Sequence, residues 1–193
     1  YYFASLMLIP SRSLTKIGDA FLAEKLKENK MDEVESIYFK SCQNQGGLGA
    51  FMFMNLIILL PVVFAILPEH FAAGYWVVFF LGLANFSKLA TGMNFPLIGL
   101  TSFHQWRTYL MIIYIAIMIG LNLLLIPSFG ISGAAVASFI SNVVFHYSGV
   151  FLIEKKLRFR ILRKEYTRPM WVALLTGIPC YLISNYFDSY TIA

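Results

Sequence analysis

The feature that most constrains this chain is a run of 46 consecutive residues, from position 108 to 153, without Asp, Glu, Lys or Arg. A helix rises about 1.5 Å per residue and needs about 20 apolar residues to cross roughly 30 Å of hydrocarbon. The run is too long for one crossing, and the sequence IPSFG at 126–130 interrupts it. We therefore predict two membrane spans, residues 108–126 and 131–153, joined by a tight turn.

The composition agrees with a membrane protein. Of the 193 residues, 59% are hydrophobic and 13% charged, and the mean hydropathy is +0.69. These values exclude an ordinary soluble enzyme and a disordered chain. The net charge of +5 is too small and too clustered for a nucleic-acid-binding surface, so a membrane lipid, and no nucleic acid, is the expected partner.

Other uncharged runs predict the remaining spans. They are residues 46–67, 71–93 and 169–187, and residues 1–10 form the tail of an earlier one. The polar stretch 11–45 has apolar residues at helical spacing and predicts two amphipathic helices at the cytoplasmic surface, with Asn29 capping the second. The predicted fold is all-α, a polytopic bundle of about six membrane segments, and we interpret the chain as a fragment at both ends.

The positions of Lys and Arg predict the orientation. Six lie in residues 11–45, seven in residues 154–168 and one in residues 94–107, whereas the loops around Glu69 and residues 127–130 have none. Short cytoplasmic loops are enriched in Lys and Arg. Residues 11–45, 94–107 and 154–168 are therefore predicted to be cytoplasmic.

Catalytic and metal-binding patterns are not evident in the sequence. The GGLG segment at 46–49 lacks the strand and the Lys-Ser/Thr pair of a phosphate-binding loop, so we interpret it as a flexible start of a helix. His70, His104 and His146 lie in separate segments, and the two cysteines are 138 positions apart. We therefore expect that the protein binds no metal ion or cofactor and is not an enzyme.

The distribution of negative charge is the most informative pattern. Residues 70–153 contain no Asp or Glu, whereas a carrier of cations normally needs a buried carboxylate. Lys88, three residues after Asn85 on one helical face, lies near the inner end of its predicted span and is a candidate for binding an anionic ligand. The alternative is that its stem reaches the lipid headgroups, and the same two interpretations apply to Arg107. The candidate substrate-binding residues are thus Lys88, Asn85 and Arg107.

Small and polar residues inside the spans predict helix packing. Gly133, Ala137 and Ser141 are spaced four apart and form a stripe on which another helix can approach closely. We expect His146 to be hydrogen-bonded to a neighbouring helix, and the alternative is that it relays protons. Interhelical hydrogen bonds are also expected for four intramembrane asparagines: Asn55, Asn85, Asn122 and Asn142.

Three segments carry a family resemblance. The sequence NLLLIPSFGISGAAVASFIS at 122–141 resembles the segment joining the last two helices of the second bundle in bacterial polysaccharide flippases, members of the multidrug, oligosaccharidyl-lipid and polysaccharide exporter superfamily. The stretches IPSRSLTKIGDAFLAEKL at 9–26 and MDEVESIYFKSCQ at 31–43 are similar to the cytoplasmic link before the ninth helix of those proteins.

The resemblance implies an all-helical transporter of two six-helix bundles, of which this chain is the C-terminal part. Its partners would be the missing N-terminal bundle of the same protein and a lipid-linked oligosaccharide, moved from the cytoplasmic to the outer leaflet of a bacterial inner membrane. A cationic central cavity would receive the diphosphate, and by position Lys88 and Arg107 are similar to such cavity cations.

Three other functions stay open at this point. A cation-coupled multidrug exporter of the same superfamily is disfavoured by the acid-free spans. A membrane-embedded glycosyl- or acyltransferase would need an Asp or His at a membrane face, which the sequence does not indicate. A purely structural membrane subunit is equally compatible with the apolar pattern.

Overall fold

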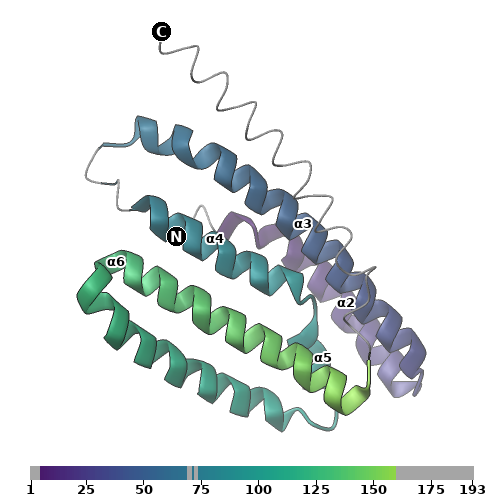
Figure 1. Ribbon diagram of the computed structural model, residues 1–193. Helices are drawn as coiled ribbons and strands as arrows, with labels where there is room; N and C mark the ends of the chain where they lie inside the picture. The colour runs from purple at the N-terminus through teal and green to yellow at the C-terminus, as the bar shows by residue number, and fades with distance from the viewer. Residues whose placement is uncertain (1–4, 69–70, 72–73, 160–193) are drawn as a thin grey trace.

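The structure, a computed structural model, describes residues 5–68, 71 and 74–159, and within these ranges it contains helices and no strand (Figure 1). The helices are α2 (Ile9–Lys27), α3 (Met31–Ile66), α4 (Gly74–Ala90), α5 (Asn94–Leu100) and α6 (Gln105–Leu157). The prediction of an all-α fold is confirmed for this part of the chain. The predicted span 169–187 and the start of the 1–10 segment lie outside the described residues.

Two of these helices, α3 and α6, are long and apolar enough to cross a membrane. The pair α4 and α5, bent by 47° at the break between them, makes a third candidate if it counts as one broken span. An apolar helix can cross a bilayer because all its backbone hydrogen bonds are internal. A chain with two or three membrane-spanning helices is therefore compatible with the part that the structure describes.

Helix α6 reverses direction in its middle, so that its two limbs lie side by side (Figure 1). The reversal is at Gly130, whose φ of 56° and ψ of −135° are not helical. The turn predicted at residues 126–130 is therefore present. Close approach of the limbs depends on Gly133, because a side chain there would meet the backbone carbonyl of Leu125 in the first limb.

The break between α2 and α3 is at residues 28–30, as predicted, but the predicted cap is wrong. Asn29 has a φ of 56°, and its N–H donates to the carbonyl of Leu26, while the N–H of Lys30 donates to the carbonyl of Lys25. These two bonds make a Schellman motif, in which Asn often takes the left-handed position. Asn29 thus closes α2, and the residue before α3 is Lys30, which makes no side-chain cap bond.

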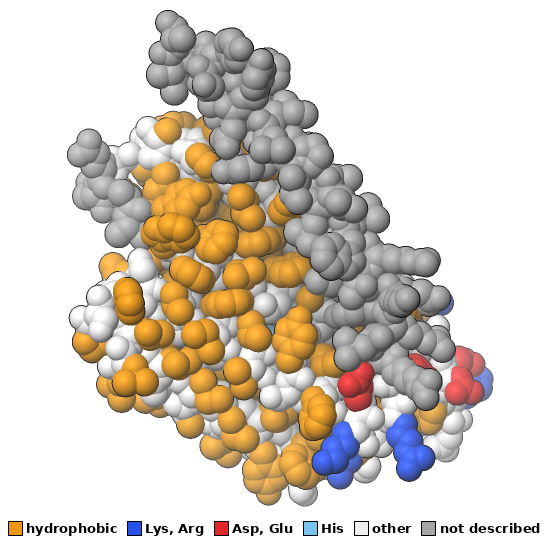
Figure 2. Space-filling model, viewed as in Figure 1, with side chains coloured by type: hydrophobic (Ala, Val, Ile, Leu, Met, Phe, Trp, Pro, Cys, Tyr) orange, Lys and Arg blue, Asp and Glu red, His pale blue; other side chains and the backbone are white. Residues whose placement is uncertain are grey.

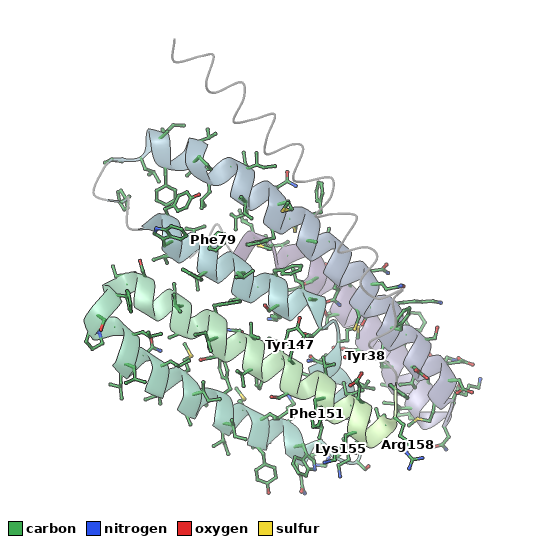
Figure 3. The ribbon with its side chains drawn as sticks, viewed as in Figure 1. Tyr38, Phe79, Tyr147, Phe151, Lys155 and Arg158 are labelled. Carbon is green, nitrogen blue, oxygen red and sulfur yellow. The ribbon has the colours of Figure 1, made fainter. Side chains whose placement is uncertain are left out.

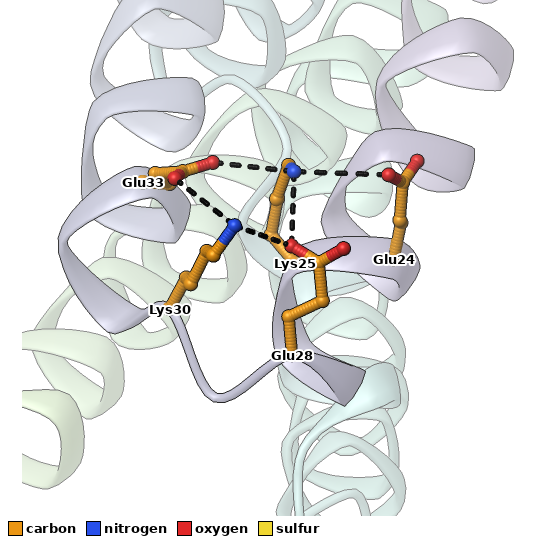
Figure 4. A network of polar contacts seen from close by, with 5 residues as sticks. All are labelled: Glu24, Lys25, Glu28, Lys30 and Glu33. Carbon is orange, nitrogen blue, oxygen red and sulfur yellow. Dashed lines mark hydrogen bonds and ion pairs between the residues drawn. The ribbon is translucent and has the colours of Figure 1, made fainter.

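A network of ion pairs connects α2 and α3 at this turn (Figure 4). The Lys25 Nζ lies 3.0 Å from a Glu28 carboxylate oxygen and 3.4 Å from one of Glu33. The Lys30 Nζ lies 3.0 Å from Glu28. Because Glu33 belongs to α3 and Lys25 to α2, the network joins the two helices at their turn.

Helix α3 is longer than predicted. Residues 31–43 and 46–67 were expected to be separate helices with a flexible junction, but α3 runs without interruption from Met31 to Ile66. Its glycines are used for packing: a Cβ on Gly49 would lie 2.8 Å from the Cβ of Leu89 in α4. Glycine therefore lets α3 and α4 approach closely here and does not end the helix.

The chain segments between helices gather at two opposite ends of the molecule (Figure 1). Residues 28–30, 101–104 and 158–159 lie at one end, and residues 67–68 and 126–130 at the other. On the face shown in Figure 2, the charged side chains of the described residues lie at the first end, and hydrophobic side chains are spread over the remaining described surface. Figure 3 places Lys155 and Arg158 at this charged end.

A buried core joins four helices near the charged end. Leu22, Tyr38, Leu97 and Ile153, from α2, α3, α5 and α6, are each at most 1% exposed and belong to one cluster. The Tyr38 hydroxyl donates a hydrogen bond of 3.4 Å to the carbonyl of Thr91, in the turn between α4 and α5. This core holds the bent α4–α5 pair against α2, α3 and α6.

Candidate functional site

A cavity of about 340 Å³ lies where residues of α2, α3, α4, α5 and α6 meet. Its polar lining includes three cationic side chains and three other polar side chains. They are Arg12, Lys16, Lys88, Gln45, Asn94 and His146.

The cations come from two helices. Arg12 and Lys16 are four residues apart on α2 and so lie on one face of that helix, and Lys88 is in the last turn of α4. The ammonium of Lys88 is close enough to the Arg12 guanidinium for a repulsive electrostatic interaction. Of the residues that the structure describes, no Asp or Glu lines the cavity. An anion bound here would relieve the repulsion between like charges.

Two residues of the cavity wall each hold a buried polar atom without a partner. The Gln45 Nε2 and the His146 Nδ1 are buried and have no hydrogen-bond partner among the described residues. Their side chains belong to residues only 4% and 6% exposed, yet both residues line the cavity. A buried polar atom without a partner costs about 1–3 kcal/mol, so these two atoms make this part of the wall less stable than a fully hydrogen-bonded one.

Asn94 positions the wall formed by α5. Its side-chain amide donates a hydrogen bond of 2.9 Å to the carbonyl of His146 in α6, and its Oδ1 accepts one of 2.8 Å from the N–H of Phe95. The ring of His146 stands edge-on to Phe95 and Phe145, with centroids 5.5 and 5.3 Å away. These contacts fix α5 against the second limb of α6.

The three predicted substrate-binding residues do not share one site. Lys88 lines the cationic cavity, but Asn85 is not among its lining residues. Arg107 lies in a separate hollow of about 230 Å³ with Asp19 and Gly99. Pro96 borders both spaces, so they are neighbours.

The Asp19 carboxylate beside Arg107 is partly buried. Its Oδ1 has no hydrogen-bond partner within the described part of the chain. Burial raises the pKa of Asp19, and the nearby Arg107 works in the opposite direction. A negative charge therefore accompanies Arg107, in contrast to the acid-free wall around Lys88.

The predicted packing stripe is buried, but most of the predicted asparagine bonds differ. Gly133, Ala137 and Ser141 are all buried in α6. The amide groups of three predicted asparagines donate to the carbonyl four residues earlier in their own helix, not to another helix. These are Asn55 to Phe51, Asn122 to Met118 and Asn142 to Ser138.

The structure also places residues that the sequence did not single out. Arg12, Lys16, Gln45 and Asn94 were not predicted as site residues, yet they line the cavity with Lys88. The one available signal is the spacing of Arg12 and Lys16, since four residues separate two cations on the same helical face.

Among residues 5–68, 71 and 74–159, no group of three or more His, Cys, Asp or Glu side chains is placed to hold a metal ion. The lining of the cavity includes cationic and hydrogen-bonding groups, a set suited to an anion. No protein-family model, curated protein or solved structure matches the chain.

Proposed function

We propose that this chain is part of a membrane flippase that moves a polyprenyl-diphosphate-linked oligosaccharide from the cytoplasmic to the outer leaflet of a bacterial inner membrane. The observation that carries the proposal is the cavity lined by Arg12, Lys16 and Lys88. Three positive charges in a wall whose described residues include no Asp or Glu match a diphosphate, and charge-assisted hydrogen bonds to phosphate oxygens are the strong ones.

The distribution of chain segments supports a transporter that crosses the membrane several times. Each limb of α6 has roughly 25 residues, enough to cross the bilayer once, and so does the apolar part of α3. The charged end of the molecule carries the segments rich in Lys and Arg, as cytoplasmic loops do. At that end the Lys156 Nζ lies 5.5 Å from the centre of the Trp106 ring, a pairing typical of the membrane interface.

Helix α2 supports a membrane setting in another way. Leu14, Ile17 and Phe21, apolar residues of this predicted amphipathic helix, are 43%, 61% and 51% exposed. Arg12 and Lys16 on the same helix line the cavity. A helix with apolar side chains outward and charged ones toward a cavity is typical of membrane proteins, where ionisable groups face a solvated interior.

A cation-coupled exporter would need a carboxylate where its ion binds, because an uncompensated cation in hydrocarbon is costly. The Asp19 carboxylate lies in the neighbouring hollow of Arg107 and is not among the residues that line the cavity. The charge of the cavity therefore favours an anionic substrate over a cationic one.

The test is a charge reversal at Lys88 in cells whose surface polysaccharide depends on the protein. We expect Lys88→Glu to abolish surface glycan and Lys88→Arg to retain it, because only the first places a carboxylate against the diphosphate. Lys40→Glu, an exposed lysine of α3 outside the cavity, is the matched control and should retain it. Wild-type amounts of surface glycan in Lys88→Glu would refute the proposal.

A further inference from the structure

An apolar cavity of about 320 Å³ adjoins the cationic one. Its wall is made by α3 between residues 51 and 67, by residues 6 and 7, and by one residue of α4. Among the described residues of that wall, Asn55 is the one with a polar side chain, and its amide donates to the Phe51 carbonyl of its own helix at 2.8 Å. The wall therefore offers almost only hydrocarbon to a ligand.

The two cavities are separated by a thin layer of side chains. Met7 lines the apolar cavity, and the next residue, Leu8, lines the cationic one. Met7 also packs in one buried cluster with Phe53 and Leu89, and Leu89 borders the cationic cavity. A molecule with a charged head and an apolar chain would have to pass only this layer of side chains to contact both cavities.

We infer that the two cavities form one site for a single-chain phosphate lipid. The phosphate lies between Arg12, Lys16 and Lys88, and the first part of the hydrocarbon chain lies along α3. The inference rests on the proposed function and adds to it where the substrate's polyprenyl chain is held.

The size of the apolar cavity sets the kind of chain. A protein cavity of about 150 Å³ holds one benzene molecule, so about 320 Å³ holds roughly a dozen carbon atoms. That is a section of one chain and not of two. Taken with the proposed function, this volume assigns the cavity to part of the polyprenyl chain of the substrate.

The orientation of the site agrees with entry of the lipid from the leaflet at the charged end of the molecule. Lys88 is in the last turn of α4, toward the charged end of the molecule, and the apolar wall extends along α3 toward the opposite end at residues 67–68 (Figure 1). A lipid in the leaflet next to the charged end has its phosphate at that end and its chain toward the membrane centre. The substrate would enter the site without turning over.

The experiment compares two probes on the protein in phosphatidylcholine nanodiscs. One is a long-chain polyprenyl phosphate and the other a five-carbon isoprenyl phosphate, and native mass spectrometry counts the bound molecules. Leu59→Trp fills the apolar cavity from an exposed position that lines it. Val62→Trp is the matched control, an exposed residue of the same helix outside that wall.

We expect Leu59→Trp to lower binding of the long-chain probe by about three- to fivefold, a modest effect because the bilayer is itself apolar. Binding of the short probe should not change, and Val62→Trp should alter neither. Lys88→Gln should weaken both probes.

Two results would overturn the inference alone: wild-type binding of the long-chain probe by Leu59→Trp, or equal competition by two-chain phosphatidic acid. Capture of residues 160–193, and not of lipid, by a photocrosslinker at position 59 would also overturn it. Binding of both probes that does not depend on Lys88 would instead overturn the proposed function.

Discussion

The bend between α4 and α5 depends on Gly92, and replacing it by alanine is the sharpest test of the packing described above. Gly92 has a φ of 57°, and a Cβ there would lie 2.7 Å from the Cys42 Sγ, and 2.8 Å from both the backbone nitrogen of Cys42 and the Ser41 Oγ. The left-handed conformation costs a residue with a side chain about 1–2 kcal/mol. Overlap with packed neighbours adds about 1–3 kcal/mol, since the α3 backbone cannot move aside freely. We expect Gly92→Ala to lower the free energy of unfolding by about 2–5 kcal/mol.

Two other glycines separate these contributions. Gly130 also has a positive φ, of 56°, but a Cβ there would have no neighbour within 4 Å. Gly130→Ala should therefore cost only the conformational part, about 1–3 kcal/mol. Gly120 is helical with open space around it, so Gly120→Ala should be neutral or stabilising by up to about 1 kcal/mol.

The assay is unfolding of the three variants in mixed micelles, with the free energy of unfolding measured by steric trapping. The expected order of stability is Gly120→Ala, then Gly130→Ala, then Gly92→Ala. A Gly92→Ala variant as stable as Gly130→Ala would refute the close approach of the α4–α5 turn to α3.

Three further predictions concern charge and packing. Burial raises the pKa of Asp19, so the folded state binds the proton more tightly and the ionised carboxylate destabilises the fold. Asp19→Asn should therefore raise the melting temperature at neutral pH, and this gain should vanish toward about pH 4, where the carboxylate is protonated in the folded state. Hydrogen bonds from Lys25 and Lys30 lower the pKa of Glu28. The ionised Glu28 therefore stabilises the fold above its ordinary pKa, and this stabilisation is lost as the pH falls through the lowered pKa. Glu28→Gln should lower the melting temperature slightly at neutral pH and not in acid. Gly133→Ala should destabilise the α6 hairpin by about 1–3 kcal/mol in the same micelle assay, and an unchanged value would contradict the contact between its limbs.

Hydrophobic pattern and helix breakers predicted much of the described fold. The reversal at Gly130 and the break at residues 28–30 both follow from local sequence, because proline, glycine and polar residues interrupt long apolar or amphipathic runs there. The glycines at 46–49 misled the prediction. Glycine ends a helix or allows close packing, and only the neighbouring Leu89 of α4 shows that Gly49 does the second.

The site was less accessible to sequence reasoning than the fold. Lys88 stood out because a charge inside an apolar helix is rare and costly. Arg12 and Lys16 did not, because α2 carries several charges and a single sequence does not tell which of them line a cavity. Asn94 was missed for a related reason: its partner, the carbonyl of His146, lies 52 positions away and belongs to the backbone, which has no sequence signature.

The central claim is that the cations of the cavity bind the diphosphate of a lipid-linked substrate while it crosses the membrane. Its most direct test is translocation of a fluorescent polyprenyl-diphosphate oligosaccharide in proteoliposomes by the protein with Arg12, Lys16 and Lys88 all replaced by Gln, with Lys40→Gln as the control. We predict that the triple variant loses translocation and that the control keeps the wild-type rate. A triple variant that translocates the substrate at the wild-type rate would contradict the claim.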